Sequence, residues 1–345
     1  MNTKTIDAIA KAVLYEGYML YPYRPSSVKN RQRFNFGVLY PRLYSEAQAG
    51  SDAWGMQTEC LVRGASPVVE VKVRFLKLVT RVVLDVTEPQ TSPLLDGSYE
   101  PASSAAPWHE AIECDVDLPI RDLNAVSSSP LSWAFRFSAK EETEQLRDQG
   151  GRDIGTIVRK QESVCGIVEI KAIPVDDKLF KLQVRVHNHT PLKTGTGQPN
   201  RDAALMRSLV SAHTLLGVVD GEFISLLEPP DDMKDLAASC QNIGTWPVLV
   251  GAQGERDTIL SSPIILYDYP QIAPESPGDL FDGTEIDEIL ALRIMTMTED
   301  EKREMRNTDD RARKILERTE NLSIEHLAKL HGTLRDMRSL KEEMP

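Results

Sequence analysis

The sequence VCGIVEIKAIPVDDKLFKLQVRVHNH, residues 164–189, carries the strongest β-strand signal in the chain. It predicts two strands, Val164–Ile173 and Phe180–His189, joined by a turn at Asp176-Asp177. Successive side chains of a strand point to opposite faces. The second strand therefore has two rows, with Leu182, Val184 and Val186 on one face and Arg185, His187 and His189 on the other. We expect an antiparallel hairpin with one buried and one solvated face.

The same alternation recurs outward from this hairpin. Residues 69–75 and 131–137 alternate apolar and polar side chains, and Glu110–Leu118 is a further candidate strand. Residues 33–40 also have a strand-like composition, and Asp220-Gly221 predicts a hairpin turn. The sequence therefore predicts an α+β, β-dominant fold. One or two antiparallel, sandwich-like sheets would span roughly residues 30–270, with a helical C-terminal extension.

Helical periodicity appears at both ends of the chain and at two places within it. Thr5–Tyr18 is amphipathic and Gly17 offers a stop, while Asp202–Thr214 and a segment ending near Cys240 are further candidates. In the tail, Thr298 and Glu301 fit a capping box. The expected tail helices span about 285–295, 299–320 and 323–340.

Composition shifts divide the chain into three predicted parts. Residues 1–86 hold the first helix and a β region, and residues 108–270 form an antiparallel β domain. Residues 271–345 hold an acidic crossing segment and the helical tail. The connecting stretch 87–107 is rich in proline and serine, which is typical of a loop.

Charge and composition exclude several functional classes. The net charge is -12, whereas a nucleic-acid-binding protein needs a basic face. The chain has no apolar run of about 18 residues and no signal-type segment, so we expect no membrane span and a cytoplasmic location. The four cysteines show no Cys-x-x-Cys pair, and we expect reduced thiols without an iron–sulfur or zinc site.

No cofactor is predicted either. Gly195-Thr196-Gly197 lacks both the P-loop ending and the dinucleotide-binding glycine spacing. His187 and His189 share a strand face, but a metal site needs three or four ligands, so two solvated histidines are the better interpretation.

The stretch GYMLYPYRPSSVKNRQRFNFGVLYPRLY, residues 17–44, concentrates aromatic rings and cations within an acidic chain. Aromatic and arginine side chains dominate protein-interface hot spots, so one interpretation is a docking surface. The predicted partner-binding residues are Tyr21, Tyr23, Arg24, Ser27, Lys29, Asn30, Arg31 and Arg33. The alternative is a β-hairpin whose tyrosines pack on the sheet while the cations are solvated.

Residues 261–288 form a second unusual stretch, rich in proline and in carboxylates. The predicted acidic surface comprises Asp268, Asp279, Asp282 and Glu285. The preferred interpretation is a segment that crosses the protein and pairs with the basic Arg24–Arg33 region. A surface for a basic partner is the second interpretation, and a calcium loop is disfavoured because the spacing is not that of an EF-hand.

Four segments carry a resemblance to a known family. They are LYPYRPSSVKNRQRF (20–34), GTWPVLVG (244–251), LSSPIILYDYPQIAPESPGDLFDGTEIDEIL (260–290) and TEDEKREMRNTDDRARKILERT (298–319). Together they resemble an uncharacterised bacterial family encoded beside the structural and maturation genes of uptake nickel–iron hydrogenases. The resemblance implies a context of hydrogenase assembly and no catalytic residues. The cysteine content excludes both hydrogenase subunits themselves.

Two functional hypotheses follow. The first is a cytosolic, non-catalytic accessory or scaffold protein that docks on a hydrogenase subunit or maturation factor through Tyr21–Arg33. The second is an enzyme with a site between the basic stretch 24–33 and the acidic stretch 268–288, where Arg24, Lys29 and Asp268 are candidates. The charged helical tail makes a second copy of the chain a further candidate partner.

Overall fold

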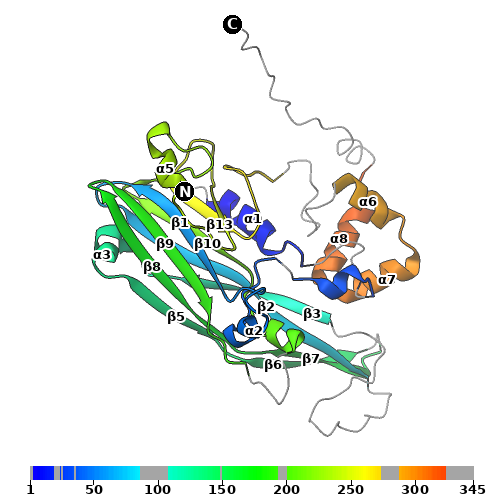
Figure 1. The fold of residues 1–345 in the computed structure, drawn as a ribbon. Coiled ribbons are helices and arrows are strands. Elements are labelled where there is room, and N and C mark those ends of the chain that lie inside the picture. Colours follow the sequence, from blue (N-terminus) through cyan, green and yellow to red (C-terminus); the bar gives the residue numbers. More distant parts are fainter. Residues whose placement is uncertain are drawn as a thin grey trace. The chain divides into compact units, whose positions relative to one another are not determined.

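The computed structural model describes residues 3–18, 24, 26–34, 36–85, 108–147, 150–192, 200–272 and 287–323. The chain divides into two compact units (Figure 1). The β unit comprises Met1–Gly17 and Phe34–Gln271, and the helical unit comprises Tyr18–Arg33 and Ile272–Pro345. The α+β, β-dominant fold class predicted from the sequence is confirmed.

The described residues of the β unit form two antiparallel sheets. The first sheet has the strand order β11-β1-β9-β8-β5. Its strands are β1 (Gly55–Arg63), β5 (Leu131–Phe137), β8 (Val164–Asp176), β9 (Leu179–Asn188) and β11 (Glu222–Ile224). The second sheet has the order β12-β13-β10-β2-β7-β6, and β3 and β4 also pair with β2. Its strands are β2 (Val68–Asp85), β3 (Trp108–Asp117), β4 (Arg121–Asp122), β6 (Lys140–Arg147), β7 (Asp153–Gln161), β10 (Val210–Val219), β12 (Trp246–Leu249) and β13 (Thr258–Ser262).

The predicted hairpin at 164–189 is confirmed as β8 and β9, which pair from Gly166↔Asn188 to Asp176↔Leu179. Leu182, Val184 and Val186 are buried, whereas Arg185 is exposed, as the alternation predicts. The inner row of β9 therefore faces the core, and the outer row remains available at the surface.

The core lies between the two sheets. The long strand β2 contributes Val69, Val71, Val73 and Phe75, all essentially inaccessible to solvent. They pack in one cluster with buried side chains of β8 and β9, among them Val168 and Val184. β2 also joins strands on both sides of the predicted boundary at 87–107, because it pairs with β3, β7 and β10.

Strand β10 overturns the predicted helix at Asp202–Thr214. Only Arg201–Leu205 is helical (α4), and β10 begins at Val210. Both faces of β10 are largely buried, because α1 (Thr3–Leu14) packs beside it over β12 and β13 (Figure 1). A strand buried on both faces loses the alternation that identifies strands in a sequence.

The turn at Asp220-Gly221 exists, and Asp220 has a φ of 56°. However, it does not close a hairpin, because β10 pairs with β2 and β13 while β11 pairs with β1 in the other sheet. The strand expected at 33–40 is also wrong. Phe34 and Gly37 adopt positive φ angles, and of the described residues in this stretch only Leu39 forms an isolated bridge, with Leu209.

Short helices connect the strands of the β unit. Besides α4, they are α2 (Arg42–Ala47), α3 (Leu123–Ser128), the 3-10 helix η2 (Asp231–Met233) and α5 (Lys234–Ala238). The helix predicted to end near Cys240 thus corresponds to η2 followed by α5. The described residues of the helical unit contain η1 (Lys29–Gln32), α6 (Asp287–Met295), α7 (Glu299–Thr308) and α8 (Asp310–Glu320).

The helix expected over 299–320 is two helices. Asp309 is extended, with φ -158° and ψ 174°, and its carboxylate accepts hydrogen bonds from the amides of Arg311 and Ala312. This side-chain cap favours a new helix start over continuation of α7. The capping box of Thr298 and Glu301 is confirmed. The predicted loop 87–107, Gly195-Thr196-Gly197 and the helix over 324–340 lie outside the described residues.

The buried histidine of β10 makes the stability of the β unit depend on pH. His213 is fully buried, and its Nδ1 lies 3.0 Å from the carbonyl oxygen of Ser211, to which it donates. Burial lowers the pKa of His213 to about 4, and the charge of Arg74 acts in the same direction, while the hydrogen bond to Ser211 and the charge of Asp115 act against it. In the unfolded chain, His213 binds a proton as the pH falls below about 6.5, whereas in the folded protein it stays neutral down to about pH 4. The free energy of unfolding therefore falls as the pH drops from 6.5 to 4.

We expect the wild-type free energy of unfolding to lose about 3 kcal/mol more than that of His213→Gln between pH 7 and pH 4. Urea unfolding at both pH values measures this difference. The carboxylates titrate equally in the wild type and in His213→Gln, so their contribution to the loss of stability cancels in the comparison. Equal losses in the two proteins would contradict a neutral buried His213.

Candidate functional site

The basic stretch lies against α7 within the helical unit. The Nη1 of Arg24 lies 2.7 Å from Oε1 of Glu301. The amide and hydroxyl of Ser26 donate to the Glu304 carboxylate at 2.9 and 3.0 Å. Carboxylates on one side of α7 thus hold the beginning of this stretch through charge-assisted contacts.

Tyr18 is the centre of the helical unit. Its ring is buried, and the guanidinium carbons of Arg33 and Arg311 lie 5.9 and 5.3 Å from the ring centroid. Its hydroxyl lies 3.1 Å from Oδ2 of Asp309, the residue that caps α8. Burial raises the pKa of Tyr18 well above its usual value, so the phenol is the donor in this contact.

Arg33 is a structural cation of the same cluster. It is only 6% exposed, and its Nη1 donates to the backbone oxygen of Tyr18 at 3.3 Å. Burial lowers the pKa of Arg33 to about 10, which still leaves it charged at neutral pH. Its charge faces the Tyr18 ring and Asp309, and both favour the charged form.

The remaining predicted docking residues have varied environments. The Asn30 amide is buried and donates to the backbone oxygen of Arg24, whereas Lys29 is exposed and Ser27 is half-buried. Tyr21, Tyr23 and the side chain of Arg31 lie outside the described residues. The partner-binding role of this stretch stays a prediction, and the exposed part of it that the structure describes centres on Lys29.

The predicted acidic surface is represented by Asp268 alone among the described residues. Asp268 belongs to the β unit and accepts hydrogen bonds from Ser225 Oγ and from the amide of Leu249. Asp279, Asp282 and Glu285 lie outside the described residues. Arg24 belongs to the helical unit, so the enzyme hypothesis built on Arg24, Lys29 and Asp268 stays a prediction.

The described contacts of Arg24 and Ser26 are with Glu301 and Glu304, two carboxylates that were not predicted. Pairing of the basic stretch with residues 261–288 stays a prediction, because residues 273–286 lie outside the described residues. The i, i+3 spacing of these two glutamates places them on the same side of α7, which is a signal the sequence does contain.

The β unit carries a cleft of about 570 Å³ beside the start of β1. Its walls come from α2 and the turn after it, from the first residues of β1, from the end of β9, and from Ile243. The lining residues are Ser45, Glu46, Ala49, Gly50, Ala53, Trp54, Gly55, Met56, Gln57, Arg185, His187 and Ile243. A cleft with both apolar and polar walls is the usual form of a binding site.

Trp54 is the aromatic anchor of the cleft. Its ring stacks on His187 with centroids 4.6 Å apart and an interplanar angle of 28°. The glycine at position 55 permits this stacking, because a Cβ there would lie 2.4 Å from His187 Cδ2. The guanidinium carbon of Arg42 lies 4.9 Å from the Trp54 ring centroid, and its Nε lies 2.7 Å from Glu46.

His187 is neutral at physiological pH. Burial lowers its pKa, while Glu169, 3.9 Å from Nδ1, acts in the opposite direction. The neighbouring His189 meets Trp54 edge-on at 5.7 Å. Both histidines were predicted on the solvated face of the strand, and the structure adds Trp54 as the ring that they contact.

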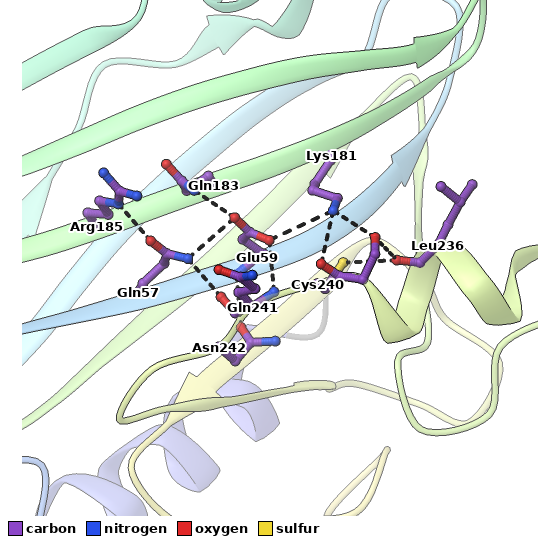
Figure 2. Close-up of polar contacts among 10 residues, drawn as sticks. Gln57, Glu59, Lys181, Gln183, Arg185, Leu236, Cys240, Gln241 and Asn242 are labelled. Atoms are coloured by element: carbon purple, nitrogen blue, oxygen red, sulfur yellow. Dashed lines mark hydrogen bonds and ion pairs between the residues drawn. The ribbon is translucent and has the colours of Figure 1, made fainter.

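A polar network that continues from the cleft along β1 and β9 fixes the positions of Gln57 and Arg185 (Figure 2). Arg185 Nε donates to Gln57 Oε1 at 2.6 Å, and Gln57 Nε2 donates to the backbone oxygen of Gln241 at 2.9 Å. Each of these two cleft residues is therefore oriented by a neighbour on another strand or segment.

Glu59 is the buried carboxylate at the centre of this network, and it is 6% exposed. It accepts hydrogen bonds from Gln183 Nε2 at 2.6 Å and from the Gln241 amide at 2.8 Å (Figure 2). Lys181 Nζ lies 3.9 Å from the same carboxylate. A buried carboxylate with this many partners serves to hold the segment 239–243 against β1.

The sequence predicted part of the cleft lining, but not the complete cleft. The alternation of apolar and polar residues predicted the outward row of β9. No sequence motif identified Trp54, Gln57 or Glu59. Trp54 and Gln57 meet the β9 row only because β1 pairs with β9, with Gln57 opposite Arg185. Such long-range register is not encoded in local periodicity.

No protein-family model matches the chain, and no curated protein matches it. The resemblance to the hydrogenase-linked family therefore rests on the sequence segments themselves. Across the described residues, no helix combines the length and hydropathy needed to cross a bilayer. The same residues contain no group of three histidine, cysteine or acidic side chains placed to hold a metal. All four cysteines are free thiols.

The Tyr18 cluster yields a stability prediction. Tyr18→Phe keeps the buried ring and both cation contacts but removes the hydroxyl that donates to Asp309. We expect the helical unit to lose about 1–2 kcal/mol of stability, since a hydrogen bond to a charged group disappears.

Hydrogen exchange of the α8 amides measures this loss. Val28→Ala is the control, because Val28 is 77% exposed and its truncation should change stability by less than about 0.5 kcal/mol. Unchanged α8 protection in Tyr18→Phe would show that the Asp309 cap does not depend on the phenol.

Proposed function

We propose that this chain is a non-catalytic, cytoplasmic accessory protein that binds another protein during the assembly or maturation of a nickel–iron hydrogenase. The hydrogenase context comes from the resemblance of four long sequence segments. The binding role is supported by the cleft of the β unit, which joins an aromatic ring, an arginine and an exposed aliphatic side chain.

The residue types in the cleft are those of protein interfaces. Trp54 and Arg185 belong to the types most enriched among binding hot spots. Ile243 is 56% exposed at the cleft wall, so its burial by a partner would remove apolar surface from water. A central apolar and aromatic patch with a polar rim is the common anatomy of a specific interface.

The pairing of the polar groups favours binding over proton transfer. Arg42 is held by Glu46, and Arg185 is held by Gln57, while the neutral His187 stacks on Trp54. Each side chain is fixed before a partner arrives, which lowers the conformational entropy lost on association. This preorganisation of Trp54, Arg185 and His187 is the observation that carries the proposal.

The test is co-expression of the affinity-tagged chain with the subunits and maturation factors of a nickel–iron hydrogenase. We expect the chain to co-purify with one of these proteins in a complex of defined mass. Ile243→Lys should weaken that complex at least about tenfold, because it places a charge in the apolar part of the interface.

Ile120→Lys is the matched control, since Ile120 is also exposed, at 61%, and does not line the cleft. Lys29→Glu examines the docking stretch predicted from the sequence. A complex weakened by Lys29→Glu and not by Ile243→Lys would assign binding to that stretch and remove the cleft from the proposal. Purification without any hydrogenase protein, together with normal hydrogenase activity in a strain lacking the chain, would overturn the proposed function.

A further inference from the structure

Strand β5 has one unpaired edge. It pairs with β8 through all seven of its residues, from Leu131↔Ile170 to Phe137↔Val164, without a register shift. Within the part of the chain that the structure describes, no strand pairs with its other edge. An unpaired edge presents a row of backbone donors and acceptors to any extended chain that fits it.

The other outer strands carry features that block such pairing. β6, KEETEQLR, has five charged residues among eight, and β12 contains Pro247. β11 is only three residues long, and β3 carries four carboxylates. β5, LSWAFRF, has one charged residue, no proline and no bulge. Among the described edges it is the one without the usual protection against strand addition.

The backbone groups on the free edge can be assigned from the hydrogen bonds of β8. The His189 amide donates to the Cys165 oxygen, so the backbone groups of Cys165 point toward β9. In an antiparallel sheet these directions alternate along a strand. The groups of Gly166 and Val168 therefore point toward β5 and meet Phe135 and Trp133, their partners in the register. It follows that Ser132, Ala134 and Arg136 present their backbone groups to the free edge.

The side chains of β5 form two rows. Phe135 and Phe137 point inward, with centroids 6.0 and 5.5 Å from that of Phe75 in the core. Trp133 belongs to the same inward row but is 37% exposed, so the core is open to solvent at this edge. A further strand added at this edge would bury the exposed apolar surface of the Trp133 ring.

We propose that β5 pairs antiparallel with β5 of a second copy of this chain, about a two-fold axis through Ala134. Because the backbone groups of Ala134 face the free edge, two such residues can exchange both of their hydrogen bonds. The register then places Trp133 opposite Phe135 of the second copy, and Leu131 opposite Phe137. The five-stranded sheets of the two copies become one continuous sheet.

A second copy fits because the strand is self-complementary about this axis. Across the inner row, Trp133 meets Phe135 as an aromatic pair and Leu131 meets Phe137 as an apolar pair, and cross-strand pairs of this kind stabilise a sheet. On the outer row, Arg136 meets Ser132, so the only charged residue of the strand does not face its own copy. The two-fold closes the interface and leaves no edge for further addition at β5.

Sedimentation equilibrium of the full chain over a range of concentrations tests the pairing. We expect a species of twice the 38.6 kDa chain mass that dissociates on dilution. Ala134→Pro removes a donor that faces away from β8, so it should leave the fold intact and abolish the dimer. Ala134→Ser keeps the donor and should dimerise as the wild type does.

A charge exchange tests the register. Ala134→Lys and Ala134→Glu each place like charges opposite each other at the axis, so each variant alone should be monomeric. Mixing the two should restore a dimer that contains one copy of each, which native mass spectrometry identifies. Thr143→Lys, on the exposed β6, is the matched control and should not affect dimerisation.

Three results would overturn the proposal. The first is a wild-type chain that remains monomeric at every concentration, and the second is a dimer that Ala134→Pro leaves intact. The third is a mixture of the two charge variants that stays monomeric. If the wild-type chain stayed monomeric and β5 instead paired with a strand of a different protein, the proposal would also be overturned.

Discussion

The burial of one face of β2 is the constraint on which the β unit depends. Val69, Val71, Val73 and Phe75 point into the space between the sheets and contact the inner rows of β8 and β9. A shift of β2 by one residue would exchange this row for Glu70, Lys72 and Arg74, which would place charges in the core. The outward row is then fixed as well, and Lys72 and Arg74 pair with Asp117 and Asp115 of β3.

The cleft follows from the same register in the other sheet. Because the inner row of β9 is buried, its outer row of Lys181, Gln183 and Arg185 must face away from the core. Pairing with β1 then sets Glu59 beside Gln183 and Gln57 beside Arg185. The polar network around Glu59 and Gln57 is therefore a consequence of core burial. Trp54 lies in the cleft because it directly precedes β1.

Local sequence patterns correctly predicted the helices and strands that have one buried face and one exposed face. The hairpin β8–β9, strands β2 and β5, and helix α1 all have one buried side, so periodicity identified them. The first half of strand β10, residues 210–214, was predicted as part of a helix because α1 covers the face that would otherwise be polar. The break at Asp309 was missed because charged residues continue on both sides of it and conceal the change of helix.

The sequence predicted which kinds of residue take part in the candidate sites, but not which residues contact one another. The cations near the N-terminus were expected to contact carboxylates, and Arg24 does, but the partner Glu301 lies in α7 and outside the expected stretch. The cleft needs single residues from α2, β1 and β9, and no local rule brings these together. Contacts between distant parts of a chain depend on strand order, which composition and periodicity do not determine.

The sheet order also separates the two proposed binding surfaces of the β unit. The cleft lies over β1 and β9, whereas the free edge belongs to β5, on the far side of β8. A two-fold axis between antiparallel strands is perpendicular to the sheet, so it carries the outer face of one copy onto the outer face of the other. Pairing at β5 would thus leave both clefts open and present them on the same side of one continuous sheet. Two equal sites on one surface bind a partner with repeated or paired epitopes more tightly than either site alone. The proposed self-association and the proposed partner binding are therefore compatible in this fold.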